Sequence, residues 1–183
     1  MIDVTLLGTS ALMPLPERAL SAAVLACGGH SILFDCGEGT QTAARRWGVS
    51  LMKTDIIALT HYHGDHYFGL PGLLQTMNSM NREVPLVITG PAGLREAMAP
   101  ILMLTGRVQY PIQLRELPEE GLELPEFGAG ARLISVPTEH RISSQGYAFM
   151  LSRPGKFQPE RAKALGLPYS LWGLLQKGQT VLW

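Results

Sequence analysis

The stretch ALTHYHGDHYFGLPGLL, residues 58–74, holds most of the histidines of the chain. Three of the five histidines in the 183-residue sequence, His61, His63 and His66, lie here with Asp65, directly after an apolar run. Such a cluster packs badly in a protein core, because buried polar groups need partners and protonated imidazoles repel one another. The pattern therefore indicates a metal site where a buried strand ends.

The spacing within the cluster predicts which side chains converge. A strand end places alternate residues on one side, so His61 and His63 are expected to point the same way. Gly64 allows the chain to turn and to bring Asp65 and His66 toward the same point. Imidazole and carboxylate ligands suit zinc, and also manganese or iron. Two metal ions can be held side by side, one by the first two histidines and one by the Asp-His pair.

The two remaining histidines have different surroundings. His140 follows the apolar run ARLISVP (131–137) and precedes another apolar run, so it lies in a loop between two expected strands. We predict it as the third imidazole that the first metal ion needs. His30 lies beside Gly28 and Gly29, a pair typical of a hairpin turn, and we expect it to be exposed and without a role in the site.

Composition and patterning predict a compact α/β protein. Hydrophobic residues make up 46% and charged residues 16% of the sequence, which excludes a disordered chain. Short apolar runs alternate with amphipathic segments, as in α/β folds. Strands are expected at 2–8, 22–27, 30–36, 54–60, 85–90, 110–117, 131–137 and 147–153, and helices within 37–48, 70–80 and 91–106. The first strand is expected to be buried.

The sequence shows neither a membrane-spanning segment nor a secretory signal, and the expected cellular location follows from this. No apolar run approaches the roughly 20 residues of a membrane-spanning helix. The N-terminal stretch has no basic region ahead of its apolar residues and carries Asp3, which is unlike a secretory signal. We therefore expect a cytoplasmic protein without membrane contact, in which Cys27 and Cys36 are reduced core residues.

Charge is unevenly distributed, although the formal net charge is zero. Residues 153–183 carry five basic residues against the single acid Glu160, a net charge of +4, which leaves −4 on residues 1–152. We take this boundary to separate a core domain from a basic arm, in which one short helix starting near Pro159 is expected and the rest is irregular. The arm is either an ordinary solvated surface or a contact for a polyanion.

Several stretches together resemble ribonuclease Z, the family of tRNA 3′-processing endonucleases with the metallo-β-lactamase fold. The histidine cluster resembles the signature of that fold, and LLGTSALMP (6–14) and FDCGEGTQ (34–41) resemble two further motifs. TGPAGL (89–94) and HRISSQGYAF (140–149) resemble two more. PGKFQPERAKALGLP (154–168) and LLQKGQTV (174–181) resemble the tRNA-binding arm of the family.

The resemblance implies a fold and an activity. The fold is a metallo-β-lactamase-like αββα sandwich, incomplete here because the chain resembles the N-terminal half, with a protruding basic arm. The activity is that of a zinc-dependent endoribonuclease, with two zinc ions per site and manganese as an alternative, which cleaves the 3′ trailer of precursor tRNA. A homodimer is also implied, because in the family the arm of one subunit serves the site of the other.

The resemblance also implies residue roles. His61, His63 and His140 would bind the first zinc ion, and Asp65 and His66 the second. Asp65 would in addition act as the general base, and the residues of FDCGEGT would shape the floor of the site. Contacts to tRNA phosphates are expected from four arm residues, Arg153, Lys156, Arg161 and Lys163. Trp172 in the arm is expected to pack rather than to stack on RNA.

Two ligands of the family have no counterpart in this chain. The family has a bridging aspartate after the arm and a histidine near its C-terminus, whereas here Glu160 is the only acid and no histidine occurs after His140. We interpret the chain as a piece of a working enzyme, with assembly from two polypeptides or an inactive metal- or RNA-binding remnant as alternatives. Phosphodiesterases and other hydrolases of small esters share the ligands, but they have no use for a basic arm.

Overall fold

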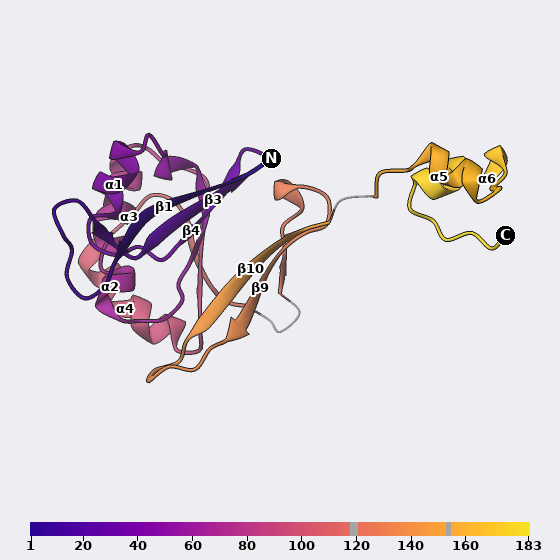
Figure 1. The fold of residues 1–183 in the computed structure, drawn as a ribbon. Helices are drawn as coiled ribbons and strands as arrows, with labels where there is room; N and C mark the ends of the chain where they lie inside the picture. The colour runs from indigo at the N-terminus through magenta and orange to yellow at the C-terminus, as the bar shows by residue number, and fades with distance from the viewer. Residues whose placement is uncertain (118–120, 153–154) are drawn as a thin grey trace. The chain divides into compact units, whose positions relative to one another are not determined.

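The computed structural model describes residues 1–117, 121–152 and 155–183 (Figure 1). The chain divides into two compact units, Met1–Met150 and Leu151–Trp183. The first unit holds two β-sheets and most of the helices, and the second unit is helical. Arg153, one of the residues predicted to contact RNA, lies outside the described residues.

A seven-stranded sheet organises the first unit, in the order β2-β1-β3-β4-β5-β6-β7. Its strands β4 to β7 are parallel neighbours, whereas β3 runs antiparallel to both β1 and β4. Central parallel strands are covered on both faces and therefore consist of continuous apolar runs. The strands are β1 (Ile2–Ser10), β2 (Ala19–Leu20), β3 (Ala22–Cys27), β4 (His30–Phe34), β5 (Thr54–Ala58), β6 (Leu86–Gly90) and β7 (Ile112–Glu116).

Helices α1 (Thr40–Arg46), α3 (Leu70–Ser79) and α4 (Leu94–Thr105) lie on one side of this sheet in Figure 1. The short α2 (Gly64–Tyr67) precedes α3. The apolar residues of α3 are spaced so that one face of the helix meets the strands. They are buried in the main core: Leu70, Leu73, Leu74 and Met77.

A second, three-stranded sheet has the order β10-β9-β8. Its strands are β8 (Leu122–Glu123), β9 (Ala131–Pro137) and β10 (Gln145–Leu151). Phe127, in the short 3-10 turn Pro125–Phe127, joins this sheet to the first one. Its ring centroid lies 5.8 Å from that of Phe149 on β10, and its carbonyl accepts a hydrogen bond from the Sγ of Cys27 on β3 at 3.3 Å. The two sheets thus share an apolar interface.

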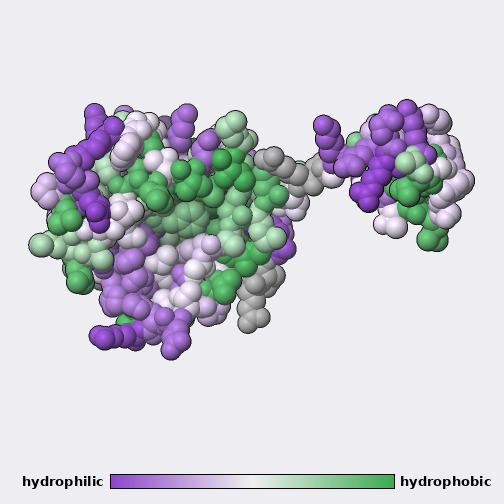
Figure 2. Space-filling model, in the orientation of Figure 1, coloured by the Kyte–Doolittle hydropathy of each residue, from purple (hydrophilic) through white to green (hydrophobic). Residues whose placement is uncertain are grey.

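The prediction of a buried first strand is wrong. Along β1, the side chains of Val4 and Leu6 are each 63% exposed, whereas Leu7 on the other face is 4% exposed. Figure 2 shows hydrophobic residues gathered over β1 and the strands beside it. One face of β1 therefore exposes apolar side chains that the described residues do not cover.

The structure also differs from the expectation that His30 is an exposed turn residue. It begins β4, and its side chain is 36% exposed. Its Nδ1 lies 3.3 Å from Oδ1 of Asp55, and its ring centroid lies 5.3 Å from that of Phe127. His30 therefore belongs to the edge of the core, although it takes no part in the histidine cluster.

The second unit contains two helices, α5 (Pro159–Ala164) and α6 (Tyr169–Gln176). The expectation of an irregular chain after the first of these helices is wrong, because α6 follows Pro168 directly. Trp172 of α6 donates its indole N–H to the carbonyl of Leu167 at 3.1 Å. Its ring contacts those of Tyr169 and Phe157, with centroids 4.4 and 5.2 Å away. Trp172 packs within the arm, as predicted.

Cys27 and Cys36 are both buried and free, which confirms the prediction for the cysteines. Among the residues that the structure describes, no helix is long and apolar enough to cross a bilayer.

Candidate metal centre

The histidine cluster lies beyond the carboxyl end of β5. This strand ends at Ala58, and the chain then runs irregularly until α2 begins at Gly64. His61 and His63 are therefore loop residues rather than the end of a strand, which corrects the predicted boundary. Loops at the carboxyl ends of parallel strands form the sites of open α/β sheets.

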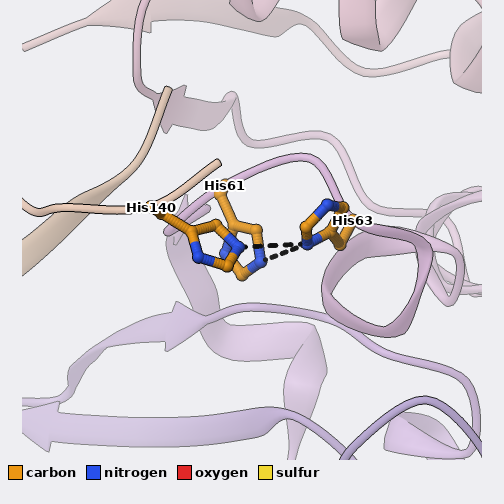
Figure 3. Close-up of side chains that lie close together, drawn as sticks. All are labelled: His61, His63 and His140. Carbon is orange, nitrogen blue, oxygen red and sulfur yellow. Dashed lines mark hydrogen bonds between the residues drawn. The ribbon is translucent and has the colours of Figure 1, made fainter. Parts of the chain in front are cut away.

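Three imidazoles meet at this place (Figure 3). One ring nitrogen from each of His61, His63 and His140 lies within 4.8 Å of the others. Nδ1 of His63 is 3.1 Å from Nε2 of His61 and 3.2 Å from Nε2 of His140. Three imidazole nitrogens directed at one point can hold a metal ion, as three histidines do in some catalytic zinc sites. The structure thus brings together the three residues predicted for the first metal ion.

Nearby groups set the orientation and charge of His61. Its Nδ1 lies 3.0 Å from the hydroxyl of Thr60, so its Nε2 is the nitrogen that faces the cluster. Burial, followed by the neighbouring imidazoles of His66 and His63, lowers the pKa of His61 to about 4. The ring is therefore neutral at neutral pH, and its lone pair is available to a metal ion.

His140 reaches the cluster from the other sheet, in the loop between β9 and β10. This loop is closed by a backbone hydrogen bond of 3.1 Å from Thr138 N–H to the Ser144 carbonyl. Gln145 N–H then donates to the carbonyl of Thr60 at 2.9 Å, and the Tyr147 hydroxyl donates to the carbonyl of Leu59 at 2.7 Å. These bonds fix the His140 loop against the segment that carries His61.

Asp65 and His66 lie beside the three imidazoles. The ring centroids of His61 and His66 are 4.0 Å apart, and Oδ2 of Asp65 is 3.8 Å from Nε2 of His66. Burial acts to raise the pKa of the Asp65 carboxyl, but a 3.0 Å hydrogen bond from Leu12 N–H and the nearby His66 outweigh it, and the pKa lies below its usual value. Asp65 is therefore ionised at neutral pH and can serve as a ligand together with His66.

Asp35 is a site residue that the sequence interpretation treated only as part of the floor. It follows β4 directly and is 4% exposed. Its Oδ1 accepts from the backbone N–H of Thr60 at 2.8 Å, and its Oδ2 accepts from the Ser21 hydroxyl at 3.1 Å. Oδ2 also lies 2.7 Å from Nδ1 of His66. The contacts connect the ends of neighbouring strands β4 and β5.

The contact with Asp35 determines how His66 can act. Burial acts to lower the pKa of His66, but the hydrogen bond and the charge of Asp35 outweigh it, and the pKa is raised. Since an ionised carboxylate only accepts hydrogen bonds, Nδ1 of His66 carries the proton. In the neutral ring this leaves the lone pair on Nε2, toward Asp65, which is the arrangement of histidines that bind metal ions.

The predicted RNA-binding residues belong to the second unit. Lys156 and Arg161 line a hollow of about 340 Å³, together with Phe157. Nζ of Lys163 lies 3.2 Å from Oε1 of Glu160, so part of its charge is neutralised. Of the predicted RNA-binding residues that the structure describes, two therefore lie around one hollow and the third is engaged in an exposed ion pair.

Comparisons with known proteins agree with this geometry. Residues 17–147 match the family model of the metallo-beta-lactamase superfamily. The ribonuclease Z of Alkaliphilus oremlandii is 41% identical over 100% of this chain and 62% of its own length. The ribonuclease Z of Lachnoclostridium phytofermentans is 40% identical over 99% of this chain and 59% of its own length. The chain thus spans about three fifths of the length of these curated relatives.

A solved structure is similar as well. The short form of human tRNase Z superposes with a TM-score of 0.68 at 33% identity and covers 82% of this chain, which spans 65% of that structure. The predicted metallo-β-lactamase fold and the resemblance to ribonuclease Z are confirmed by these matches. The chain belongs to the metallo-beta-lactamase superfamily.

Proposed function

We propose that the chain carries the metal centre of a ribonuclease Z, which cleaves the 3′ trailer from precursor tRNA. The observation that carries the proposal is the convergence of three imidazoles beside the Asp65-His66 pair, in a chain 41% identical to a ribonuclease Z. Because the chain spans 62% of that relative, the activity is proposed for the protein of which this metal centre is part.

We propose that these donor atoms bind two metal ions, which would be zinc, with manganese as an alternative. His61, His63 and His140 would hold the first ion, and Asp65 and His66 the second. When bound, such ions lower the pKa of a coordinated water to about 7 and offset charge that develops on a phosphodiester.

Asp65 would orient the attacking water and accept its proton. Its carboxylate is held in place by the N–H of Leu12 and stays ionised because its pKa is lowered. Asp35 would keep the His66 ring in the orientation in which Nε2 faces Asp65. Attack on the phosphorus would leave a 3′-hydroxyl on the tRNA.

The second unit would bind the tRNA through its phosphates. Lys156 and Arg161 line one hollow and Lys163 lies on the same helix as Arg161, while Arg153 is a further candidate from the sequence. Contacts of this kind bind RNA by charge and shape, so the affinity should fall as salt rises. A small ester has no use for these groups, which argues for the nuclease over a small-ester phosphodiesterase.

Metal analysis and end mapping test the proposal together. The 183-residue chain is incubated with zinc or manganese, its metal content is measured by mass spectrometry, and the 3′ ends released from a precursor tRNA are mapped. His63→Ala should lower the metal content, whereas the matched variant His30→Ala should keep it, since His30 lies outside the cluster. A full metal complement in His63→Ala would refute the ligand set.

The cleavage assay distinguishes a nuclease from a small-ester hydrolase and from an inactive chain. A cut after the discriminator base supports the nuclease, and hydrolysis of bis-p-nitrophenyl phosphate without any cut in tRNA would favour the small-ester hydrolase. Bound metal with neither reaction would refute catalysis by this chain alone. Sedimentation velocity tests the homodimer that we propose for the protein, and fractionation of cells tests the proposed cytoplasmic location.

A further inference from the structure

A hollow of about 400 Å³ adjoins the metal centre. It shares His63 and Asp65 with the centre, and its other walls include Leu12, Glu38 and Phe68. Its volume lies within the roughly 300–1,000 Å³ typical of ligand sites. A group that is covalently attached to a phosphate at the metal centre could therefore enter this hollow.

Phe68 offers a flat aromatic surface to the hollow. The residue is 62% exposed. Its ring lies against Gly64, where an added Cβ would come within 2.5 Å of a ring carbon. Phe68 N–H donates to the carbonyl of Gly64 at 3.0 Å, at the end of the short helix α2 that carries Asp65. The ring is thus supported by backbone on one side and is held by the same turn as the metal ligands.

Leu12 contributes an apolar side chain to the same hollow. Its N–H is bonded to Asp65, as described above, while the residue is 91% exposed. Its φ of 62° lies in the left-handed region, which residues other than glycine adopt rarely. Backbone conformations of this kind concentrate at functional sites. The main chain of Leu12 is therefore fixed at the metal centre while its side chain remains free to cover a ligand.

The charge of the hollow favours a neutral ligand. Across residues 1–117, 121–152 and 155–183, the Glu38 carboxylate makes no hydrogen bond or ion pair. Glu38 is exposed and lines the hollow, so it disfavours a second phosphate there. Of the parts of a nucleotide, the base is neutral and has a π face, and such faces stack on aromatic side chains.

We propose that this hollow binds a nucleobase next to the scissile phosphate, stacked on Phe68 and covered by Leu12. The proposal rests on the proposed function in one respect, namely that RNA is the substrate. It adds a subsite that positions the RNA strand through one base, independently of the basic arm.

A short RNA isolates this subsite from the arm. The probe is a trinucleotide with a central 2-aminopurine, whose fluorescence is quenched on stacking, titrated into the zinc-loaded 183-residue chain. Phe68→Leu removes the aromatic face and should weaken binding at least fivefold, since stacking contributes about 1–3 kcal/mol per base. Phe68→Tyr and Phe68→Trp keep an aromatic face and should retain both binding and quenching.

The matched control is Trp47→Leu, which removes an aromatic ring that is 64% exposed and lines a different hollow. Trinucleotide binding should be unchanged in this variant, and thermal melts of all variants check that they are folded. Equal binding by Phe68→Leu and the unsubstituted chain would overturn the proposal, as would a probe that shows no saturable quenching at millimolar protein.

Precursor tRNA cleavage distinguishes failure of the subsite from failure of the proposed function. If the trinucleotide binds through Phe68 but tRNA is not cut, the nuclease proposal fails and the subsite stands. If tRNA is cut and Phe68→Leu alters neither the trinucleotide affinity nor the KM for tRNA, the subsite fails and the nuclease stands.

Discussion

Replacing Asp35 with Asn should selectively weaken the second metal position. Asn tolerates the left-handed backbone that Asp35 adopts, with φ of 55°, so the loop itself need not change. Its carbonyl oxygen can still accept from Thr60 N–H in place of Oδ1. Its amide nitrogen, however, would face Nδ1 of His66 where a carboxylate oxygen now accepts at 2.7 Å.

This replacement changes the proton position on His66. An amide donor opposite Nδ1 favours the form of the ring with its proton on Nε2, the nitrogen that faces Asp65. The ring then has no lone pair for a metal ion at that position. Changing the carboxylate partner of a metal-binding histidine typically lowers metal affinity about 10–100-fold. The charge-assisted hydrogen bond is also replaced by a neutral one, which should cost about 1 kcal/mol of unfolding free energy.

Calorimetric titration with zinc measures the effect at each position. Asp35→Asn should bind one ion with an affinity near that of the unsubstituted chain and the second 10–100-fold more weakly. Asp55→Asn is the matched control: Asp55 accepts a 2.9 Å hydrogen bond from Ser31 N–H and pairs with His30, away from the cluster. Two ions bound by Asp35→Asn with unchanged affinities would refute the reasoning, because His66 would then not need its carboxylate partner.

Three further predictions concern metal removal, RNA binding and the core. A chelator should lower the unfolding temperature, since bound ions at a hundredfold excess over Kd add about 2.7 kcal/mol of stability, and an unchanged melt would argue against a bound metal. Lys156→Ala should reduce the slope of log affinity for tRNA against log salt by about 0.7–0.9, and Lys163→Ala by less because of its pairing with Glu160. Neither lysine variant should change the zinc content, which metal analysis checks. Leu74→Ala, at a side chain with 0% exposure, should cost about 2–5 kcal/mol in urea unfolding, and a loss below 1 kcal/mol would mean that α3 packs loosely.

Most of the site could be predicted from the sequence, including the distant His140, which is inferred as the third imidazole that one metal ion needs. The role of Asp35 depends on strand order and could not be predicted. His61, His63, Asp65 and His66 lie within six residues, so their common role follows from spacing alone. Asp35 is separated from this group by a helix and a strand. Only the parallel pairing of β4 with β5 places it there, and no periodicity in the sequence encodes which strands become neighbours.

The same distinction explains two of the differences between the expected and the observed fold. The apolar residues of β1 correctly indicate a strand, but burial depends on which elements cover it, and Val4 and Leu6 remain exposed. In the second unit, Pro168 suggests a break in the chain. Proline is also favourable where a helix begins, and α6 starts at Tyr169. The local sequence therefore indicated where both segments lie. The burial of β1 and the helical conformation of α6 depend on the rest of the structure.

The metal centre also bears on how the two sheets are held together. His61 and His63 belong to the first sheet through the loop after β5, and His140 belongs to the second sheet through the loop after β9. Without an ion, the described contacts between these loops are the 2.9 Å and 2.7 Å hydrogen bonds to Thr60 and Leu59 and the close approach of the rings themselves. An ion held by all three imidazoles would bind only the state in which the sheets are joined. By linkage, it would then stabilise that state in proportion to its own binding free energy. The three histidines that bind the ion would thus also stabilise the packing of the two sheets, which in turn holds these histidines in place.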